Sequence, residues 1–380
     1  MTPETPLAFD SLAIHAGLPI PADGSPVAPP IVLSSTFEHP APEDLDQRRY
    51  LYGRYDNPNR KSLEEALAAL EGGAVAYAFS SGNMATHAML HALPPGSRIL
   101  YHRDIYSGTR RAMRELWQGR LEFAEADLRD HAEAERALAE RPTALLWIET
   151  PSNPLLHVLD IAALAALARR HGAHSLVDNT WATPVLQCPL ALGADVVLHS
   201  TSKYIGGHTD LIGGALVLRG AGPLAESLRS IQFLGGGVPS PFDCWLARRG
   251  LMTLPVRVRA HVENGRRVAE YLRAHPKVSQ VYFPGFAGPA DAALVARQMK
   301  APGAVLSFRH ADGDEAASRL PGKLRLVRNA TSLGGVESLL EWRYPSEGPN
   351  SPTPKDLLRL SVGLEDPADI ERDLDRALRG

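Results

Sequence analysis

The chain has 380 residues and a formal net charge of −3 at pH 7, with 44% hydrophobic and 22% charged residues. This composition is ordinary for a globular enzyme of two or three domains, and the small net charge gives no reason to expect nucleic acid or an anionic membrane as a partner. No apolar run reaches the roughly 18 residues of a membrane span, and the N-terminus lacks the apolar core of a secretory signal. The two cysteines form no disulfide framework and no cluster indicates a metal, so we expect a reduced, cytoplasmic setting and no metal site.

The first 60 residues are rich in proline and show little helical or strand periodicity. They also contain Phe37 and the aromatic segment YLYGRYDNP, which are too apolar for a disordered tail. We therefore predict that residues 1–60 form an N-terminal arm that packs on a neighbouring subunit.

Residues 61–250 alternate between helical and strand-like segments. The segment SLEEALAAL is predicted to be a helix, because Ser62 and Glu65 have capping-box spacing and Gly72 and Gly73 end the pattern. The predicted strands are AVAYAF, SRILYH, LEFAEA, TALLWIE, SLVD, DVVLHS and ALVL. This alternation predicts an α/β domain with a mostly parallel sheet and helices on both faces, which binds ligands beyond the carboxyl ends of its strands.

The pattern changes in residues 251–380. An arginine-rich helix is predicted over 256–274, followed by the strands VSQVYF, AVLSF, LRLVRNA and LLRLSV and a last helix capped near Asp366. This part is predicted to be a smaller C-terminal α+β domain.

The stretch DVVLHSTSKYIGGHTDLIGGALVL, residues 195–218, carries one lysine just after a buried strand. Ser200 and Ser202 precede Lys203, and glycines follow it. The hydroxyls could hold an anion, and the glycines let a ligand approach the backbone. This arrangement suits a lysine that forms a Schiff base beside a phosphate, as pyridoxal phosphate requires. The stretch alone is equally compatible with a surface lysine in a Gly/Ser hairpin loop.

Three other predicted strand ends carry polar groups. The turn SSGN, residues 80–83, leads into a helix whose first N–H groups could bind a phosphate, although most such turns bind nothing. Asp178 could keep a pyridinium nitrogen protonated, or could simply cap a turn. Tyr106 could stack on a ring, or could be a half-buried aromatic side chain.

Two residues of the C-terminal part could bind a carboxylate. Arg359 lies among apolar residues in LLRLSVG, so its guanidinium must be paired, either in a structural ion pair or with a ligand carboxylate. Ser332, before a Gly-Gly turn, could add a hydrogen bond to the same carboxylate. Arg54, in YLYGRYDNP, is solvated by default.

Taken together, these motifs resemble those of the Cys/Met-metabolism family of pyridoxal-phosphate enzymes, which includes cystathionine γ-synthase, γ-lyase and β-lyase, methionine γ-lyase and the homoserine sulfhydrylases. The resemblance extends from about Ser11 to the last helix, and its motifs, in family order, are YGRYDNP, FSSGN, ETPSNP, VDNTWATP, HSTSKYIGGH, SLGGVESL and LRLSVGLED. It implies the aspartate-aminotransferase-like (type I) fold and a homo-oligomer, usually a tetramer of two catalytic dimers.

The resemblance also implies an activity. It indicates a trans-sulfuration enzyme that acts on a sulfur amino acid or an activated homoserine, most similar to cystathionine γ-lyase or γ-synthase. Cystathionine β-lyase and O-acylhomoserine sulfhydrylase are the alternatives within the family. A non-catalytic protein that keeps the cofactor is a remote alternative.

The resemblance assigns a role to each matching residue. Lys203 would be the Schiff-base lysine and proton shuttle, and Tyr106 would stack on the cofactor ring and take part in catalysis. The remaining cofactor contacts would come from Gly82, Asn83, Asn153, Asp178, Ser200 and Ser202. The substrate carboxylate would be bound by Asn153, Ser332 and Arg359. Tyr52 and Arg54 would reach the cofactor phosphate of the adjacent subunit, and Tyr52 also its substrate.

Several positions depart from the family pattern. Ser202 replaces a frequent threonine and Asn83 a frequent methionine, and we expect little effect from either. Thr331 replaces the glutamate with which many γ-enzymes bind a distal amino group, and Gly108 replaces the reactive cysteine of methionine γ-lyases. The segment EWRYPSEGPNSPTPKD replaces the usual HPAxMTH-type segment, so we expect residues 341–356 to alter specificity.

Overall fold

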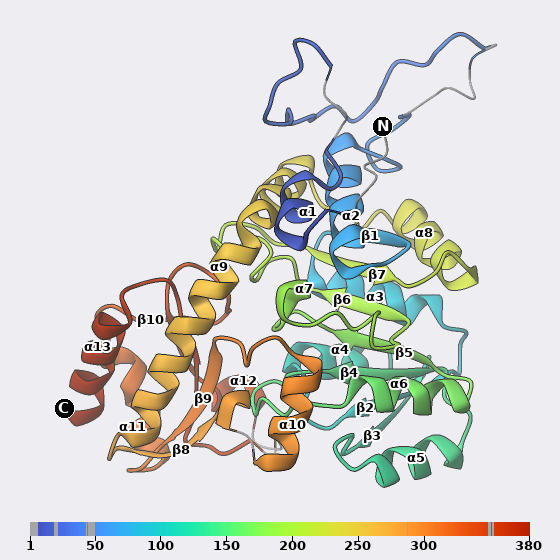
Figure 1. The fold of residues 1–380 in the computed structure, drawn as a ribbon. Coiled ribbons are helices and arrows are strands. Elements are labelled where there is room, and N and C mark those ends of the chain that lie inside the picture. The colour runs from blue at the N-terminus through green and yellow to red at the C-terminus, as the bar shows by residue number, and fades with distance from the viewer. Residues whose placement is uncertain are drawn as a thin grey trace.

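The computed structural model describes residues 7–18, 22–42, 44, 50–286, 288–348, 351 and 353–380. Two β-sheets organise the chain, a seven-stranded sheet with the order β1-β7-β6-β5-β4-β2-β3 and a five-stranded sheet with the order β10-β11-β12-β9-β8. Figure 1 shows the larger sheet among the green and cyan helices and the smaller sheet near the C-terminus.

The larger sheet is mostly parallel, as the sequence predicts. Its strands are β1 (Val75–Phe79), β2 (Arg98–His102), β3 (Glu122–Ala126), β4 (Leu145–Glu149), β5 (His174–Asp178), β6 (Val196–His199) and β7 (Gly214–Leu218). Only β7 runs against its neighbours, pairing antiparallel with both β1 and β6. The carboxyl ends of the other strands therefore meet at one edge, where the polar motifs follow them.

Helices cover both faces of this sheet. They are α2 (Pro58–Glu71), α3 (Gly82–Ala92), α4 (Ser107–Leu116), α5 (His131–Glu140), α6 (Ile161–Arg170), α7 (Thr183–Leu186) and α8 (Pro223–Gly235). Because side chains alternate along a strand, neighbouring residues enter different cores. Val197 packs in the cluster that contains residues of α2, whereas Leu198 packs in the cluster that contains residues of α3.

The smaller sheet forms the C-terminal α+β unit. Its elements are β8 (Val278–Tyr282), η2 (Pro284–Phe286), α10 (Pro289–Gln298), β9 (Val305–His310), α11 (Asp314–Arg319), η3 (Leu320–Lys323), β10 (Arg328–Asn329), β11 (Leu339–Trp342), α12 (Tyr344–Glu347), β12 (Leu357–Ser361) and α13 (Pro367–Arg379). Leu306, Phe308 and Leu360 are fully buried in its own core. The predicted cap at Asp366 is confirmed, since its carboxylate accepts the Ala368 N–H at 2.8 Å.

One helix, α9 (Pro241–Ala274), joins the two sheets and runs unbroken for 34 residues (Figure 1). Leu251 packs in the core of the large sheet and Val268 in that of the small sheet. The sequence predicts only the segment of this helix from residue 256 onward, because glycine and proline, here Gly250 and Pro255, disfavour a helix interior. Residue 250, where the sequence analysis divides the two domains, lies inside this helix.

The N-terminal part differs from its prediction in two ways. Residues Phe9–His15 form a helix, α1, whose Ala13 is fully buried, although no helical pattern is visible in the sequence. Helix α2 begins at Pro58, where the Asn57 side chain accepts the Asn59 N–H at 2.9 Å, and not at the predicted capping box. A proline at the first helical position favours this earlier start.

Parts of the described chain between α1 and α2 loop away from the two sheets (Figure 1). The predicted strand LRLVRNA is limited to the two residues of β10. Over the described ranges, no helix is both long and apolar enough to cross a membrane.

Candidate active site

Ten of the twelve predicted site residues line a single cavity of about 420 Å³ at the carboxyl edge of the large sheet. They are Gly82, Asn83, Tyr106, Asn153, Asp178, Ser200, Ser202, Lys203, Ser332 and Arg359. Segments separated by more than 270 residues in the sequence thus meet in one place, and the small domain supplies one wall.

The first turn of α3 lines the cavity. The Ser81 hydroxyl accepts the Met84 N–H at 2.9 Å and so caps the helix. The cap leaves the N–H groups of Gly82 and Asn83 available at the helix N-terminus, where an anion is favoured. Ser200 faces the same space, and its backbone N–H is held by the Thr180 hydroxyl at 2.9 Å.

Lys203 lies between the two domains. Its Nζ donates a hydrogen bond of 2.9 Å to the hydroxyl of Ser332. Burial lowers the pKa of Lys203 to about 8, and the nearby Arg359 charge acts in the same direction. Ser332 has a φ of 97°, a left-handed conformation that is unusual for a residue with a side chain. An amine with a pKa near 8 is mostly protonated at physiological pH, but a far larger fraction of it is neutral than of an ordinary lysine, and this neutral form can act as a base.

Two carboxylates stand side by side at the ends of β4 and β5, because Glu149 is directly opposite Asp178 in the parallel register. Asp178 accepts the backbone N–H of Thr180 at 3.0 Å. Burial raises the pKa of Asp178, while its bonds from Thr180 and the nearby His199 oppose this. Burial and the charge of Asp178 raise the pKa of Glu149 well above its ordinary value. Both carboxyl groups therefore have raised pKa values, and that of Glu149 is raised the more strongly because Asp178 stands beside it.

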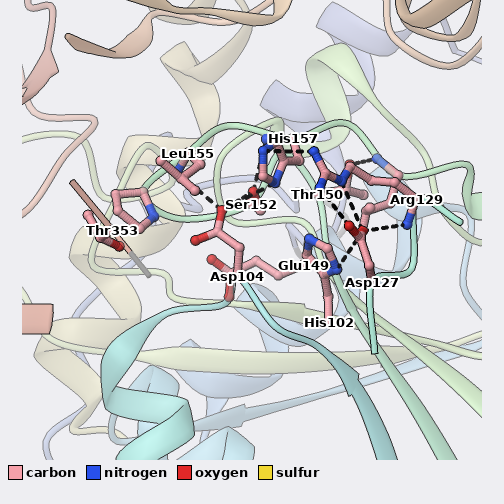
Figure 2. A network of polar contacts seen from close by, with 12 residues as sticks. His102, Asp104, Asp127, Arg129, Glu149, Thr150, Ser152, Leu155, His157 and Thr353 are labelled. Atoms are coloured by element: carbon pink, nitrogen blue, oxygen red, sulfur yellow. Dashed lines mark hydrogen bonds and ion pairs between the residues drawn. The ribbon is translucent and has the colours of Figure 1, made fainter. Parts of the chain in front are cut away.

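A polar network holds the loops that carry Tyr106 and Asn153 (Figure 2). Glu149 accepts the backbone N–H of Tyr106 at 2.8 Å. Asp104 accepts the hydroxyl of Ser152 and, at 3.1 Å, the backbone N–H of Leu155. The two loops are therefore bound to each other through acids that are almost fully buried.

Beside these acids, the same figure shows a second group of contacts, in which Asp127 pairs with Arg129 at 2.5 Å and Arg129 lies 3.2 Å from the ring of His157. Burial lowers the pKa of His157 to about 4, so this ring is neutral at physiological pH. None of these three residues lines the cavity.

Arg359 is only 4% exposed and is held from three sides. It donates to Asn153 Oδ1 at 3.1 Å, to the Ser332 carbonyl at 3.3 Å and to Glu341 Oε2 at 2.9 Å. Burial lowers its pKa to about 10, and the charge of Arg343 contributes. The guanidinium remains charged at physiological pH, as a carboxylate-binding group must.

Tyr106 is 42% exposed at the mouth of the cavity and lies directly before α4. A Cβ atom on Gly108 would lie 2.4 Å from the Tyr106 ring. The ring therefore occupies the space that a side chain at position 108 would need.

Tyr52 and Arg54 do not line the cavity of their own chain. Arg54 donates through Nη1 to the Phe233 carbonyl, and the ring of its neighbour Tyr55 stacks on Phe233 at 4.1 Å. Tyr52 is 42% exposed. Their role in a neighbouring subunit therefore stays a prediction.

The sequence analysis missed several cavity residues. Glu149 and Thr180 belong to the motifs ETPSNP and VDNTWATP, so their position in the sequence close to Asn153 and Asp178 could have predicted that they line the cavity. Trp181 also lines the cavity, and the guanidinium of Arg359 lies 5.9 Å from its ring centroid. Arg343 also lines the cavity, but it is brought there by the pairing of β11 with β12, and no motif around it in the sequence predicts this position.

Comparison with known proteins agrees with this geometry. Residues 10–379 match the family model described as "Cys/Met metabolism PLP-dependent enzyme". The chain belongs to this family. It is 46% identical over 376 residues to cystathionine gamma-synthase of Mycobacterium tuberculosis, covering 96% of this chain and 95% of that protein. It is 40% identical over 377 residues to cystathionine beta-lyase of Lactococcus lactis, covering 96% and 97%.

Among solved structures of family members, cystathionine gamma synthase from Xanthomonas oryzae in complex with cystathionine superposes with a TM-score of 0.94. The two share 41% sequence identity, and the match covers 99% of this chain and 98% of that chain. The family assignment makes the protein an enzyme that depends on pyridoxal phosphate and confirms the predicted large and small domains of this fold.

The cavity fits the cofactor of the family. Its lining combines an anion-binding helix N-terminus, a buried acid and an amine of lowered pKa. These match a phosphate, a basic ring nitrogen and an aldehyde, which are the three functional parts of pyridoxal phosphate.

Proposed function

We propose that this enzyme catalyses trans-sulfuration at the γ-carbon of an amino acid, by elimination from cystathionine or by replacement on an activated homoserine. The names of the relatives support the substrate class, since they include a γ-synthase, a β-lyase and a γ-lyase. When bound, pyridoxal phosphate supplies an electron sink for the carbon next to the amino group.

The residues of the chain take complementary parts in this proposal. The N–H groups of Gly82 and Asn83, with Ser200 and Ser202, bind the phosphate. The carboxylate of Asp178 holds the ring nitrogen protonated. These contacts fix the position of the cofactor relative to the lysine.

Arg359 and Asn153 orient the substrate by binding its carboxylate, together with the hydroxyl of Ser332. Lys203 takes the proton from the α-carbon and, for γ-chemistry, moves protons between neighbouring carbons. Tyr106, at the mouth, covers the ring and shields these transfers from water.

The observation that carries the proposal is the hydrogen bond of 2.9 Å between Lys203 and Ser332. It places the amine from the large domain within reach of the carboxylate-binding wall of the small domain, since Arg359 also donates to the Ser332 carbonyl. An amino acid whose carboxylate is bound there presents its α-carbon to Lys203, as proton removal requires.

Product analysis tests the proposal. The holoenzyme is incubated with L-cystathionine alone, and separately with O-succinyl- or O-acetylhomoserine plus cysteine. We expect 2-oxobutyrate from the first mixture or cystathionine from the second, and no product from Lys203→Ala. Formation of pyruvate from cystathionine without 2-oxobutyrate would instead assign β-elimination. No Lys203-dependent turnover in any mixture would contradict the proposal and favour a non-catalytic protein.

The proposal also includes a shared site in a homodimer. Tyr52 and Arg54 lie outside the cavity of their own chain, as expected for residues that serve a neighbouring subunit. Sedimentation of the holoenzyme distinguishes a dimer or tetramer from a monomer.

A further inference from the structure

Five charged residues, three of them buried arginines, form a continuous ladder beside the cavity, in the order Arg359, Glu341, Arg343, Glu347, Arg110. The four bonds along it measure 2.9, 2.6, 2.5 and 3.1 Å. The side chains of Arg343 and Glu347 are 2% and 1% exposed. The ladder lies in the segment EWRYPSEG, which departs from the family pattern, and ends on α4 of the large domain.

Strand pairing explains why these residues meet. Glu341 is directly opposite Arg359 in the antiparallel β11–β12 pair, so the two side chains lie on the same face. Arg343, two residues further, continues on that face, and its N–H still pairs with the Leu357 carbonyl at 3.0 Å. Glu347 lies one helical turn beyond Arg343, at the end of α12.

Glu341 is shared between two arginines. Its Oε2 accepts from Arg359 at 2.9 Å and from Arg343 at 2.6 Å, while its Oε1 accepts the hydroxyl of Ser346 at 2.8 Å. Without Arg343, Arg359 would be the one arginine that pairs with Glu341 among the residues that the structure describes. By Coulomb's law, the positive charge of Arg343 offsets part of the negative potential that Glu341 exerts at Arg359 and at a ligand beside it.

The ladder also has a net charge. It contains three arginines and two glutamates, so one positive charge is left for a ligand. Arg343 itself lines the cavity, and its buried Nε–H has no hydrogen-bond partner among the described residues. Arg110, at the far end, does not line the cavity.

We propose that Arg343 is a positioning residue for the substrate carboxylate. By sharing Glu341, it keeps Arg359 oriented toward the cavity and offsets the negative charge that Glu341 would otherwise present there. This inference rests on the proposed function, in which Arg359 binds the substrate carboxylate. The competing view is that the ladder only joins the two domains, as buried ion pairs can do without any role in binding.

Two probes that differ only in the carboxylate separate these views. L-Norvaline and n-butylamine are titrated into the holoenzyme, and binding is followed by the change in cofactor absorbance. In Arg343→Met we expect norvaline to bind about tenfold more weakly, which corresponds to roughly 1.4 kcal/mol, with butylamine unchanged. Arg110→Met is the matched control, because it breaks the ladder away from the cavity, and we expect norvaline affinity to stay within about threefold of wild type.

A second set of variants tests the charge balance between Glu341 and the two arginines that share it. Glu341→Gln should bind norvaline more tightly than wild type, and this variant also serves if Arg343→Met does not fold. The double variant Glu341→Gln/Arg343→Met should recover most of the lost affinity, because the shared anion and its second partner are removed together. A purely structural ladder predicts instead that the double variant is worse than either single variant and that both probes are affected equally.

The outcomes separate a failure of this inference from a failure of the proposed function on which it rests. If wild type shows no preference for norvaline over butylamine, the carboxylate site at Arg359 and this inference are both wrong. If wild type shows the preference and Arg343→Met retains it, only the role of Arg343 is wrong.

Discussion

Replacement of Ser332 tests the contact between Lys203 and the small domain. The Ser332 hydroxyl accepts from the Lys203 amine at 2.9 Å, and its backbone has a φ of 97°. A hydrogen bond from a charged amine is about twice as strong as one from a neutral donor, so losing this acceptor disfavours the protonated form by roughly 1 kcal/mol. Both Ser332→Gly and Ser332→Ala should therefore lower the pKa of Lys203 from about 8 toward about 7.

The two variants should differ in stability. Glycine accepts a positive φ without strain, whereas alanine keeps the cost, so Ser332→Gly should be about 1 kcal/mol more stable than Ser332→Ala. Urea unfolding of the apoenzymes measures this difference. The order is opposite to that expected for an ordinary surface position, where alanine is the more stable residue.

The assay for the pKa is the rate at which the apoenzyme binds pyridoxal phosphate. Reaction with the aldehyde needs the neutral amine, so the rate rises with pH through the pKa of Lys203 and then levels off. Both variants should reach this plateau at lower pH than wild type. A midpoint that stays in place or moves upward would refute the assigned contact, as would equal stability of the two variants.

Three further predictions follow from individual contacts. Lys203→Ala should abolish product formation while far-ultraviolet circular dichroism stays unchanged, and residual turnover would require another base. Arg54→Ala should weaken cofactor retention about tenfold, a loss typical of one charge-assisted contact, while far-ultraviolet circular dichroism shows an intact fold, and normal retention in dialysis would count against a shared site. The Asp373 carboxylate accepts the N–H groups of Arg325, Leu326 and Val327 at 2.8 to 3.0 Å, and its pKa is lowered chiefly by bonds from Arg376 and these groups against the effect of burial. The ionised carboxylate therefore stabilises the folded state above about pH 4, and this stabilisation is lost as the pH falls through the lowered pKa. Asp373→Asn should lower the free energy of unfolding by about 1–3 kcal/mol at pH 7 and should reduce its dependence on pH in the acid range.

The elements that the sequence predicts well are those with an uninterrupted periodic pattern. The strands before Tyr106, Asn153, Asp178 and Lys203 are short apolar runs bounded by turns, and all four form the parallel part of the sheet. Because these strands end at one edge, the positions of the polar residues after them could be predicted without knowledge of any contact.

The elements that the sequence predicts poorly depend on tertiary contacts. The first half of α9 contains Gly250 and Pro255, yet it stays helical, and within it Arg257 donates to the Gly250 carbonyl at 2.7 Å. Helix α1 is only seven residues long and is held by Arg248, which donates to the carbonyls of Ala13 and Ile14. Neither stabilising contact is visible in a local window of sequence.

The same limit applied to the site. The sequence identifies Arg359 as a carboxylate-binding candidate but not its partner, because Glu341 meets it through the register of two strands that are 14 residues apart along the chain. A buried arginine predicts that some acid lies near it, and only strand pairing shows which one.

Helix α9 has a consequence for engineering by recombination. Arg257 donates to the Tyr204 carbonyl at 2.8 Å, next to Lys203, and Asn264 donates to the Gly363 carbonyl at 3.0 Å, just beyond the strand of Arg359. The backbone of Gly250 is so close to the same lysine loop that a Cβ there would lie 2.3 Å from the Ile205 carbonyl oxygen. One continuous helix therefore fixes the distance between the Lys203 amine and the proposed carboxylate-binding Arg359. Chimaeras of related enzymes that exchange their C-terminal parts should have the junction after Ala274. A crossover near residue 250 would combine most of α9 from one parent with the lysine loop of the other.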